Sequence, residues 1–122
     1  MTPLTWVALT LAGGAGSMSR YFVDHFVIFR SHERFPYGIL IVNLTGAFAL
    51  GLLTAWSSPH AVLRVAELGF LGAFTTFSTW MLDTHRLGED GRTRAAVLNI
   101  VVSLAGGLAA AALGRAVGAM FT

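Results

Sequence analysis

One uncharged stretch of the chain, Leu68–Leu82, combines hydroxyl and aromatic side chains. A buried hydroxyl without a hydrogen-bond partner costs about 1–3 kcal/mol, so an apolar helix normally carries few of them. Four hydroxyl groups occur here: Thr75, Thr76, Ser78 and Thr79. In a continuous helix, Phe74, Phe77 and Trp80 would share one side, beside the stripe of hydroxyls. An aromatic row beside a hydroxyl row predicts a path for a polar solute through an apolar wall.

The composition of the whole chain predicts a membrane protein of one domain. Its 122 residues are 55% hydrophobic and only 11% charged, with a mean hydropathy of +0.69, whereas soluble proteins carry about 25% charged residues. Cysteine is absent, so a disulfide framework and a thiolate metal site are excluded. A net charge of +2 is too small to indicate a nucleic-acid partner. We expect membrane lipid to surround a single transmembrane domain over residues 1–122.

Four membrane-spanning helices are predicted, because a helix needs about 20 apolar residues to cross the hydrocarbon core. Tyr37–Trp56 and Ala95–Gly114 carry no charge over that length. The first and third candidates are less apolar, since they contain Arg20 and Asp24 or Glu67. The expected helices cover approximately residues 4–29, 37–56, 65–86 and 95–119. Short polar segments with proline and glycine separate them, so the predicted fold class is an all-α, multi-pass membrane protein.

Small residues predict where helices approach closely and where one helix breaks. Rows of small residues four apart occur in the second and fourth spans: Asn43, Ala47 and Gly51, and Gly106, Ala110, Gly114 and Gly118. Such rows allow two helices to pack closely. In the third span, Gly72 weakens the helix by about 1 kcal/mol relative to alanine. Broken backbone survives at membrane depth only when it is buried in protein or faces a wet cavity, so a break at Gly72–Thr75 would itself indicate an ion site.

Four helices of this length form a bundle too thin to pack well around a pore, so we expect a dimer. Orientation follows from arginine, because basic residues in short loops favour the cytoplasm. The loops on one side carry Arg30, Arg34, Arg86, Arg92 and Arg94, and the opposite side carries Arg64 and Arg115. The count of arginines alone places the first and third loops in the cytoplasm and both termini outside.

Four segments together resemble the small fluoride channels called Fluc or CrcB. They are GGAGSMSRY at Gly13–Tyr21, YGILIVNLTGAFALG at Tyr37–Gly51, GFLGAFTTFSTW at Gly69–Trp80 and NIVVS at Asn99–Ser103. The TTFST core at Thr75–Thr79 is quite specific, and the resemblance covers most of the chain. It implies an antiparallel dimer of four-helix protomers, each with a broken third helix, and a pair of narrow, fluoride-selective pores.

The resemblance also implies roles for individual residues. Fluoride holds its water tightly, so a pore must replace that water with hydrogen-bond donors or positive dipoles, such as an amide N–H or the edge of a phenyl ring. The residues implied to line the fluoride pore are Asn43, Phe77, Ser78, Thr79, Trp80 and Ser103. Arg20 is implied to lie at an aqueous vestibule, where a cation raises the local anion concentration. A structural sodium ion at the dimer interface is implied on the backbone carbonyls of Gly72 and Thr75.

Two features depart from the family pattern and leave the subunit composition open. Trp80 stands where the family usually has a second phenylalanine, and its indole is bulkier and adds an N–H donor. The uneven distribution of arginine suits a fixed orientation better than insertion in both directions. We therefore expect a homodimer, with half of a heterodimer formed with a paralogue as the alternative.

Two other classes remain as alternatives to a channel. A small multidrug-type proton-coupled exporter has a similar size but needs a membrane-embedded carboxylate, and only Glu67 and Asp24, both near span ends, are eligible. A non-transporting membrane subunit would leave the hydroxyl and phenyl track unexplained. A triad of Ser78, Asp83 and His85 has no oxyanion element or elbow motif, so we do not expect an enzyme. The expected task is passive export of cytoplasmic fluoride across a bacterial inner membrane, which lowers its toxicity.

Overall fold

The computed structural model describes residues 2–31, 35–56 and 61–121, and helices account for nearly all of them. In chain order the elements are α1 (Pro3–Ser31), α2 (Tyr37–Ala55), α3 (Ala61–Arg64), the π-helix η1 (Val65–Leu71), α4 (Gly72–Phe74), α5 (Ser78–Glu89) and α6 (Thr93–Ala119). α3, η1 and α4 join end to end. Together with α5 they form the third of four helical rods, and this third rod is broken once. Within the described ranges there is no strand, and the prediction of an all-α fold with four helical rods is confirmed.

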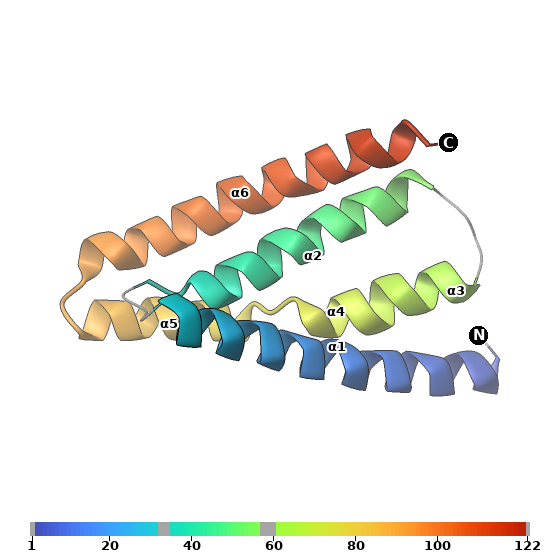
Figure 1. Cartoon of the computed structure of the whole chain (residues 1–122), viewed down its shortest axis with the longest axis horizontal. Helices are drawn as coiled ribbons and strands as arrows, with labels where there is room; N and C mark the ends of the chain where they lie inside the picture. The colour runs from blue at the N-terminus through green and yellow to red at the C-terminus, as the bar shows by residue number, and fades with distance from the viewer. Residues whose placement is uncertain (1, 32–34, 57–60, 122) are drawn as a thin grey trace.

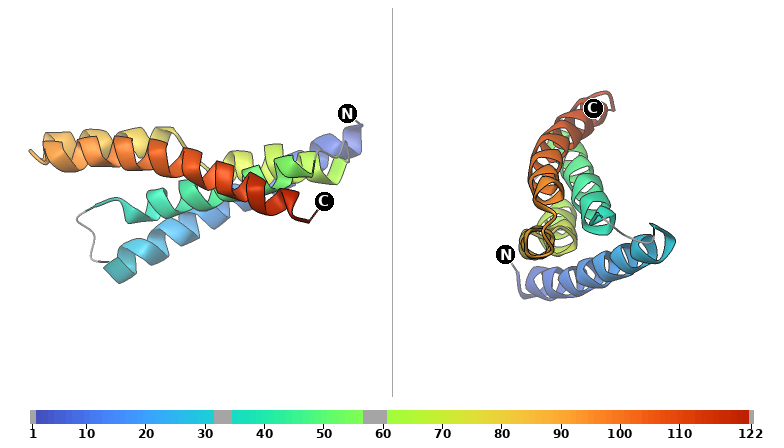
Figure 2. Two further views of the ribbon diagram at one scale, coloured as in Figure 1. Left: turned by 90° about the horizontal axis from the view of Figure 1, so that it is seen from above. Right: turned by 90° about the vertical axis from the view of Figure 1, so that its left-hand side faces the viewer.

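The rods run side by side along the long axis of the molecule (Figure 1). The chain passes along this axis four times, so its amino and carboxyl ends lie at the same end of the bundle. α6 packs along α2, whereas α1 packs along η1 and α4. α1 is inclined to the α2–α6 pair, as the two further views show (Figure 2).

The exterior of the protomer is strongly apolar. Two helices, α2 and α6, are long and apolar enough to cross a membrane. Large apolar side chains are exposed on every rod, among them Trp6, Phe22, Ile41, Leu68 and Leu108. An apolar surface of this extent needs lipid or another subunit as its neighbour.

Glycine brings the backbones of α2 and α6 into direct contact. Gly51 of α2 lies against the carbonyl of Ala111, and Gly114 of α6 lies against the carbonyl of Phe48. A Cβ atom at either glycine would overlap backbone atoms of the other helix. The small-residue rows in the second and fourth spans thus form a close helix contact, as predicted.

α1 meets the first half of the broken rod through a second close contact. A Cβ atom at Gly16 of α1 would overlap the carbonyl of Phe70, and one at Gly69 would lie 2.9 Å from the Cβ of Ala12 and 3.1 Å from the carbonyl oxygen of Leu9. This contact places η1 and α4 firmly against α1. It leaves their opposite side turned toward α2 and α6.

The π-helical segment η1 has wider turns than its neighbours. At its end the N–H of Gly72 donates to the carbonyl of Glu67, five residues earlier, and to that of Gly69. A π-helical turn accommodates more residues than an α-helical turn, and such segments are frequent at functional sites. η1 therefore changes the direction in which the residues after it face.

Candidate functional site

The third rod breaks between α4 and α5, at Thr75 to Phe77. Thr75 has extended backbone angles, φ −78° and ψ 157°, and helical structure resumes at Ser78. Both the N–H and the Oγ1 hydroxyl of Thr75 donate to the carbonyl of Leu71, each at 3.0 Å. The break lies later than the expected Gly72–Thr75, because Gly72 itself keeps helical angles, φ −60° and ψ −37°.

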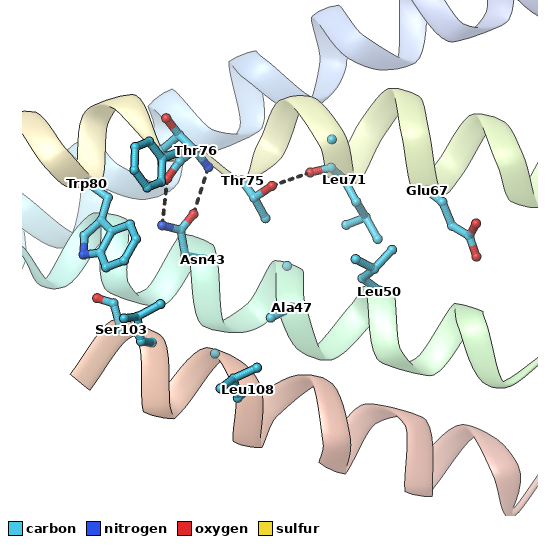
Figure 3. A pocket seen from close by; sticks show the side chains of 15 residues that line it. Asn43, Ala47, Leu50, Glu67, Leu71, Thr75, Thr76, Trp80, Ser103 and Leu108 are labelled. Atoms are coloured by element: carbon cyan, nitrogen blue, oxygen red, sulfur yellow. Dashed lines mark hydrogen bonds between the residues drawn. The ribbon is translucent and has the colours of Figure 1, made fainter. Parts of the chain in front are cut away.

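Asn43 of α2 holds the broken backbone in place. Its Oδ1 accepts a hydrogen bond from the N–H of Thr76 at 2.9 Å, and its Nδ2 donates to the carbonyl of Thr76, also at 2.9 Å (Figure 3). One amide side chain thus replaces two hydrogen bonds that a continuous helix would have made. An amide nitrogen carries two hydrogens, so one donor of Asn43 remains for another partner.

The hydroxyl groups at the break all have hydrogen-bond partners within the protomer. Thr76 Oγ1 accepts from the N–H of Thr79 at 3.2 Å, which caps the start of α5. The same Oγ1 donates to Thr79 Oγ1 at 3.4 Å and lies 3.4 Å from Ser78 Oγ. These side chains therefore stabilise the start of α5 after the break.

The expected single row of aromatic rings is wrong, because the break divides it. Phe74 ends α4 and stacks on Phe70, with ring centroids 5.8 Å apart. Phe77 lies in the break and meets Trp80 edge to face, at 5.5 Å and 86°. Phe77 is 69% exposed on the protomer, so most of its ring is open to a ligand or to a second subunit.

A groove of about 550 Å³ runs beside the break, between α2, the third rod and α6. Most of its wall is apolar, but several polar groups reach it from different rods. The polar side chains among its lining residues are those of Asn43, Glu67, Thr75, Thr76 and Ser103. Few polar groups in a mainly apolar cavity are typical of a ligand site.

Ser103 is unusual within this groove. Its Oγ is buried, and no described residue forms a hydrogen bond with it. A buried polar group left unpaired costs about 1–3 kcal/mol, so the hydroxyl is suited to a ligand that accepts a hydrogen bond.

Most, but not all, of the residues predicted for the site line the groove. Its lining includes Asn43, Phe77, Trp80, Ser103, Gly72 and Thr75. Ser78 and Thr79 lie just outside it, at the start of α5. Arg20 lies on α1, half-buried and within electrostatic reach of Asp24, and it is not part of the groove wall. Whether these residues contact fluoride stays a prediction.

The carbonyl groups before the break form a second polar feature. The last four carbonyls of a helix lack partners within it, and the N–H of Thr76, which would have bonded Gly72, is taken by Asn43. Oxygen ligands of this kind suit a hard cation such as sodium. Among the described residues there is no cluster of acidic, histidine or cysteine side chains suited to a metal.

Glu67 lies in the first half of the third rod. This rod begins at Ala61, and Glu67 belongs to η1. Its half-buried side chain lines the far end of the groove, away from Trp80 and Ser103 (Figure 3).

The sequence analysis gives no role to two polar residues near the groove, Thr84 and Asn99, although Asn99 begins the segment Asn99–Ser103. Asn99 is only 1% exposed; its carbonyl accepts from Trp80 Nε1 at 3.1 Å, and its Nδ2 donates to Thr84 Oγ1 at 2.8 Å. The hydroxyl of Thr84 donates in turn to the carbonyl of Trp80 at 2.9 Å. The available signals were an amide inside an apolar span and an indole N–H that needs an acceptor when buried.

Comparisons with known proteins identify relatives over nearly the whole chain. Residues 7–115 match the family described as "CrcB-like protein, Camphor Resistance (CrcB)". The protein named fluoride-specific ion channel FluC 2 of Mycobacterium tuberculosis H37Rv is 50% identical over 115 residues, covering 94% of this chain and 91% of that protein. FluC 1 of Symbiobacterium thermophilum is 44% identical over 122 residues, covering 94% and 98%. FluC 1 of Rubrobacter xylanophilus is 47% identical over 116 residues, covering 93% of each.

Proposed function

This chain belongs to the CrcB family, and we propose that it is a passive, fluoride-selective channel that lets cytoplasmic fluoride leave a bacterial cell through the inner membrane. The identity of the transported ion is inferred from the relatives, which are named fluoride-specific ion channels. The membrane location is supported by the apolar helices α2 and α6. Membership of this family sets aside the proton-coupled exporter, the non-transporting subunit and an enzyme.

The observation that carries the proposal is the groove at the break, where donors not used within the protomer lie in a mainly apolar wall. Asn43 has one amide hydrogen beyond its bond to Thr76, and the buried Oγ of Ser103 has no partner among the described residues. Phe77 presents an exposed ring, whose edge carries the positive part of its quadrupole. Amide, hydroxyl and ring edge can together replace the water of a small anion without binding it through a fixed charge.

The fluoride path then follows the polar side of the third rod. Asn43, Phe77, Trp80 and Ser103 line it in the groove, and Ser78 and Thr79 continue it along the first turn of α5. Arg20 of α1 acts from an aqueous vestibule, where its charge concentrates anions.

We further propose that two subunits pair in antiparallel orientation through the face that carries the groove. Phe77 and Gly72 are exposed on this face of the protomer, and a second subunit would enclose both. A structural sodium ion on the carbonyls of Gly72 and Thr75 would then lie where the two broken rods meet. The pair is a homodimer in the simplest form; a heterodimer with a paralogue is the alternative that the uneven arginine distribution favours.

Fluoride efflux from liposomes tests the function directly. Purified protein is reconstituted into vesicles loaded with potassium fluoride, valinomycin is added to release potassium, and external fluoride is followed with an electrode. Rapid fluoride efflux is expected, with no efflux of chloride from matched vesicles. Vesicles that stay tight to fluoride, although they contain folded and inserted protein, would falsify the proposal.

Subunit composition is tested separately. Two differently tagged copies of the chain are produced together, and a membrane-impermeant reagent labels a cysteine added at one terminus. A homodimer of opposite orientations labels from both sides of the membrane, whereas labelling from one side alone indicates a fixed orientation and a different partner subunit.

A further inference from the structure

Trp80 introduces a hydrogen-bond donor into the wall of the groove, and the structure shows where that donor goes. Its Nε1 donates to the backbone carbonyl of Asn99 at 3.1 Å, and its side chain is buried, with 9% of its surface exposed. An indole nitrogen carries one hydrogen and accepts none. The N–H of Trp80 is therefore used within the protomer and does not serve as a direct donor to an anion.

The indole N–H makes one of three hydrogen bonds that join Trp80, Thr84 and Asn99 across α5 and α6; the other two involve the Thr84 hydroxyl and the backbone carbonyl of Trp80. Thr84 Oγ1 donates to the carbonyl of Trp80 at 2.9 Å and accepts from Asn99 Nδ2 at 2.8 Å. Asn99 thus binds Trp80 through its carbonyl and Thr84 through its side chain. Its burial means that loss of the Thr84 hydroxyl would leave an amide hydrogen unpaired away from water.

Phe77 depends on this arrangement for the direction of its ring. The ring is 69% exposed on the protomer, and its one ring contact among the described residues is the edge-to-face contact with Trp80. An edge-to-face pair is sensitive to the angle between its two planes. A shift of the indole therefore changes which part of the Phe77 ring faces the groove.

We propose that Thr84 and Asn99 form a positioning pair, which fixes the Trp80 indole and through it directs the Phe77 ring edge into the fluoride path. This inference rests on the fluoride channel proposed above. Neither residue touches the ion. Their role is to set the geometry of the two aromatic side chains that do line the groove.

The test compares Thr84→Val in two backgrounds, the natural chain and Trp80→Phe. Valine keeps the shape of threonine but removes both hydrogen bonds of the hydroxyl. In the natural chain we expect fluoride efflux to fall about tenfold, because the two hydrogen bonds that join Thr84 to Trp80 and Asn99 are lost. In the Trp80→Phe background we expect less than about a twofold further change, because the indole is already gone and the two sites are coupled.

A matched control is Thr10→Val on α1. Thr10 Oγ1 donates to the carbonyl of Trp6 at 2.9 Å, in the same spacing of four residues as Thr84 and Trp80, but on an exposed side of the bundle. Fluoride efflux through the Thr10→Val variant should equal that of the natural chain. An equal loss for Thr84→Val in both backgrounds would show that Thr84 only stabilises α5, and the inference would be overturned.

A second measurement does not depend on transport. In a chain with Trp6→Phe and Trp56→Phe, Trp80 is the only indole, and its fluorescence reports its surroundings. Thr84→Val should shift the emission to longer wavelength and increase quenching by acrylamide. Unchanged emission and quenching would overturn the inference even if fluoride efflux occurs, whereas vesicles tight to fluoride with a clear spectral change would refute the channel and leave the positioning pair standing.

Discussion

The two halves of the third rod are held by opposite means. Before the break, η1 and α4 pack against α1 through backbone contacts made possible by Gly16 and Gly69. After the break, α5 packs against α6 through side-chain hydrogen bonds of Trp80, Thr84 and Asn99. The rod therefore changes neighbours at the break, from α1 to α6. A groove with donors opens where the change occurs, and Asn43 of α2 connects the two halves there.

The largest effect is expected where the backbone of α1 contacts the first half of the third rod. Gly16→Ala would force its new methyl group into the carbonyl of Phe70 and against the N–H of Phe74. Overpacking of this kind costs about 1–3 kcal/mol or more, and neither partner is a flexible side-chain end. The thermal midpoint of unfolding in detergent should fall strongly. Gly14→Ala is the control, because nothing lies within 4 Å of its added methyl group; equal midpoints would show that α1 does not hold the first half.

The next largest effect is expected when Asn43, which connects the two halves of the third rod, is changed. Asn43→Asp keeps an acceptor for the Thr76 N–H but removes the donor to the Thr76 carbonyl and places a negative charge in the groove. Hydrogen-bond loss and repulsion of an anion together should lower fluoride efflux by about a hundredfold. Efflux per folded protein is the measurement, and a rate like that of the natural chain would remove Asn43 from the path.

A smaller effect is expected at the ring exposed beside the break. Phe77→Ile removes the aromatic edge but keeps an apolar side chain. Because Phe77 is mostly exposed on the protomer, folding should be preserved, while efflux falls about tenfold through loss of the ring's positive edge. Phe22→Ile on the exposed side of α1 is the control. Equal rates for both variants would mean that the ring edge plays no part.

The smallest change is expected at Ser103. Ser103→Ala removes a buried hydroxyl that has no partner among the described residues, so stability should stay equal or rise slightly. Efflux should fall about fivefold, because one donor to the ion is lost. A clear loss of thermal stability would show instead that the hydroxyl serves the fold.

The sequence was sufficient for the helices but not for the shape of the break. Uncharged runs such as Tyr37–Trp56 predict a spanning helix from local composition, and α2 follows it closely. Gly72 indicated a broken third rod, yet helical geometry continues through it. The break follows at Thr75 to Phe77, where the backbone of Thr76 is bonded to Asn43, 33 residues away along the chain. A contact of that range has no local signal.

The same limit explains the aromatic residues and the positioning pair. The single row expected for Phe74, Phe77 and Trp80 assumed a continuous helix, and the break rotates the later rings away. Thr84 and Asn99 lie on different helices, and they become partners only through the alignment of α5 with α6.

The π-helical segment η1 determines how many residues are needed before the break. With wider turns over Val65–Leu71, the peptide of Thr76 arrives on the side of the rod that faces α2. A uniform α-helix of 3.6 residues per turn would need a different number of residues to deliver it there. The number of residues before the break, more than their identity, therefore sets the register of the third rod against α2.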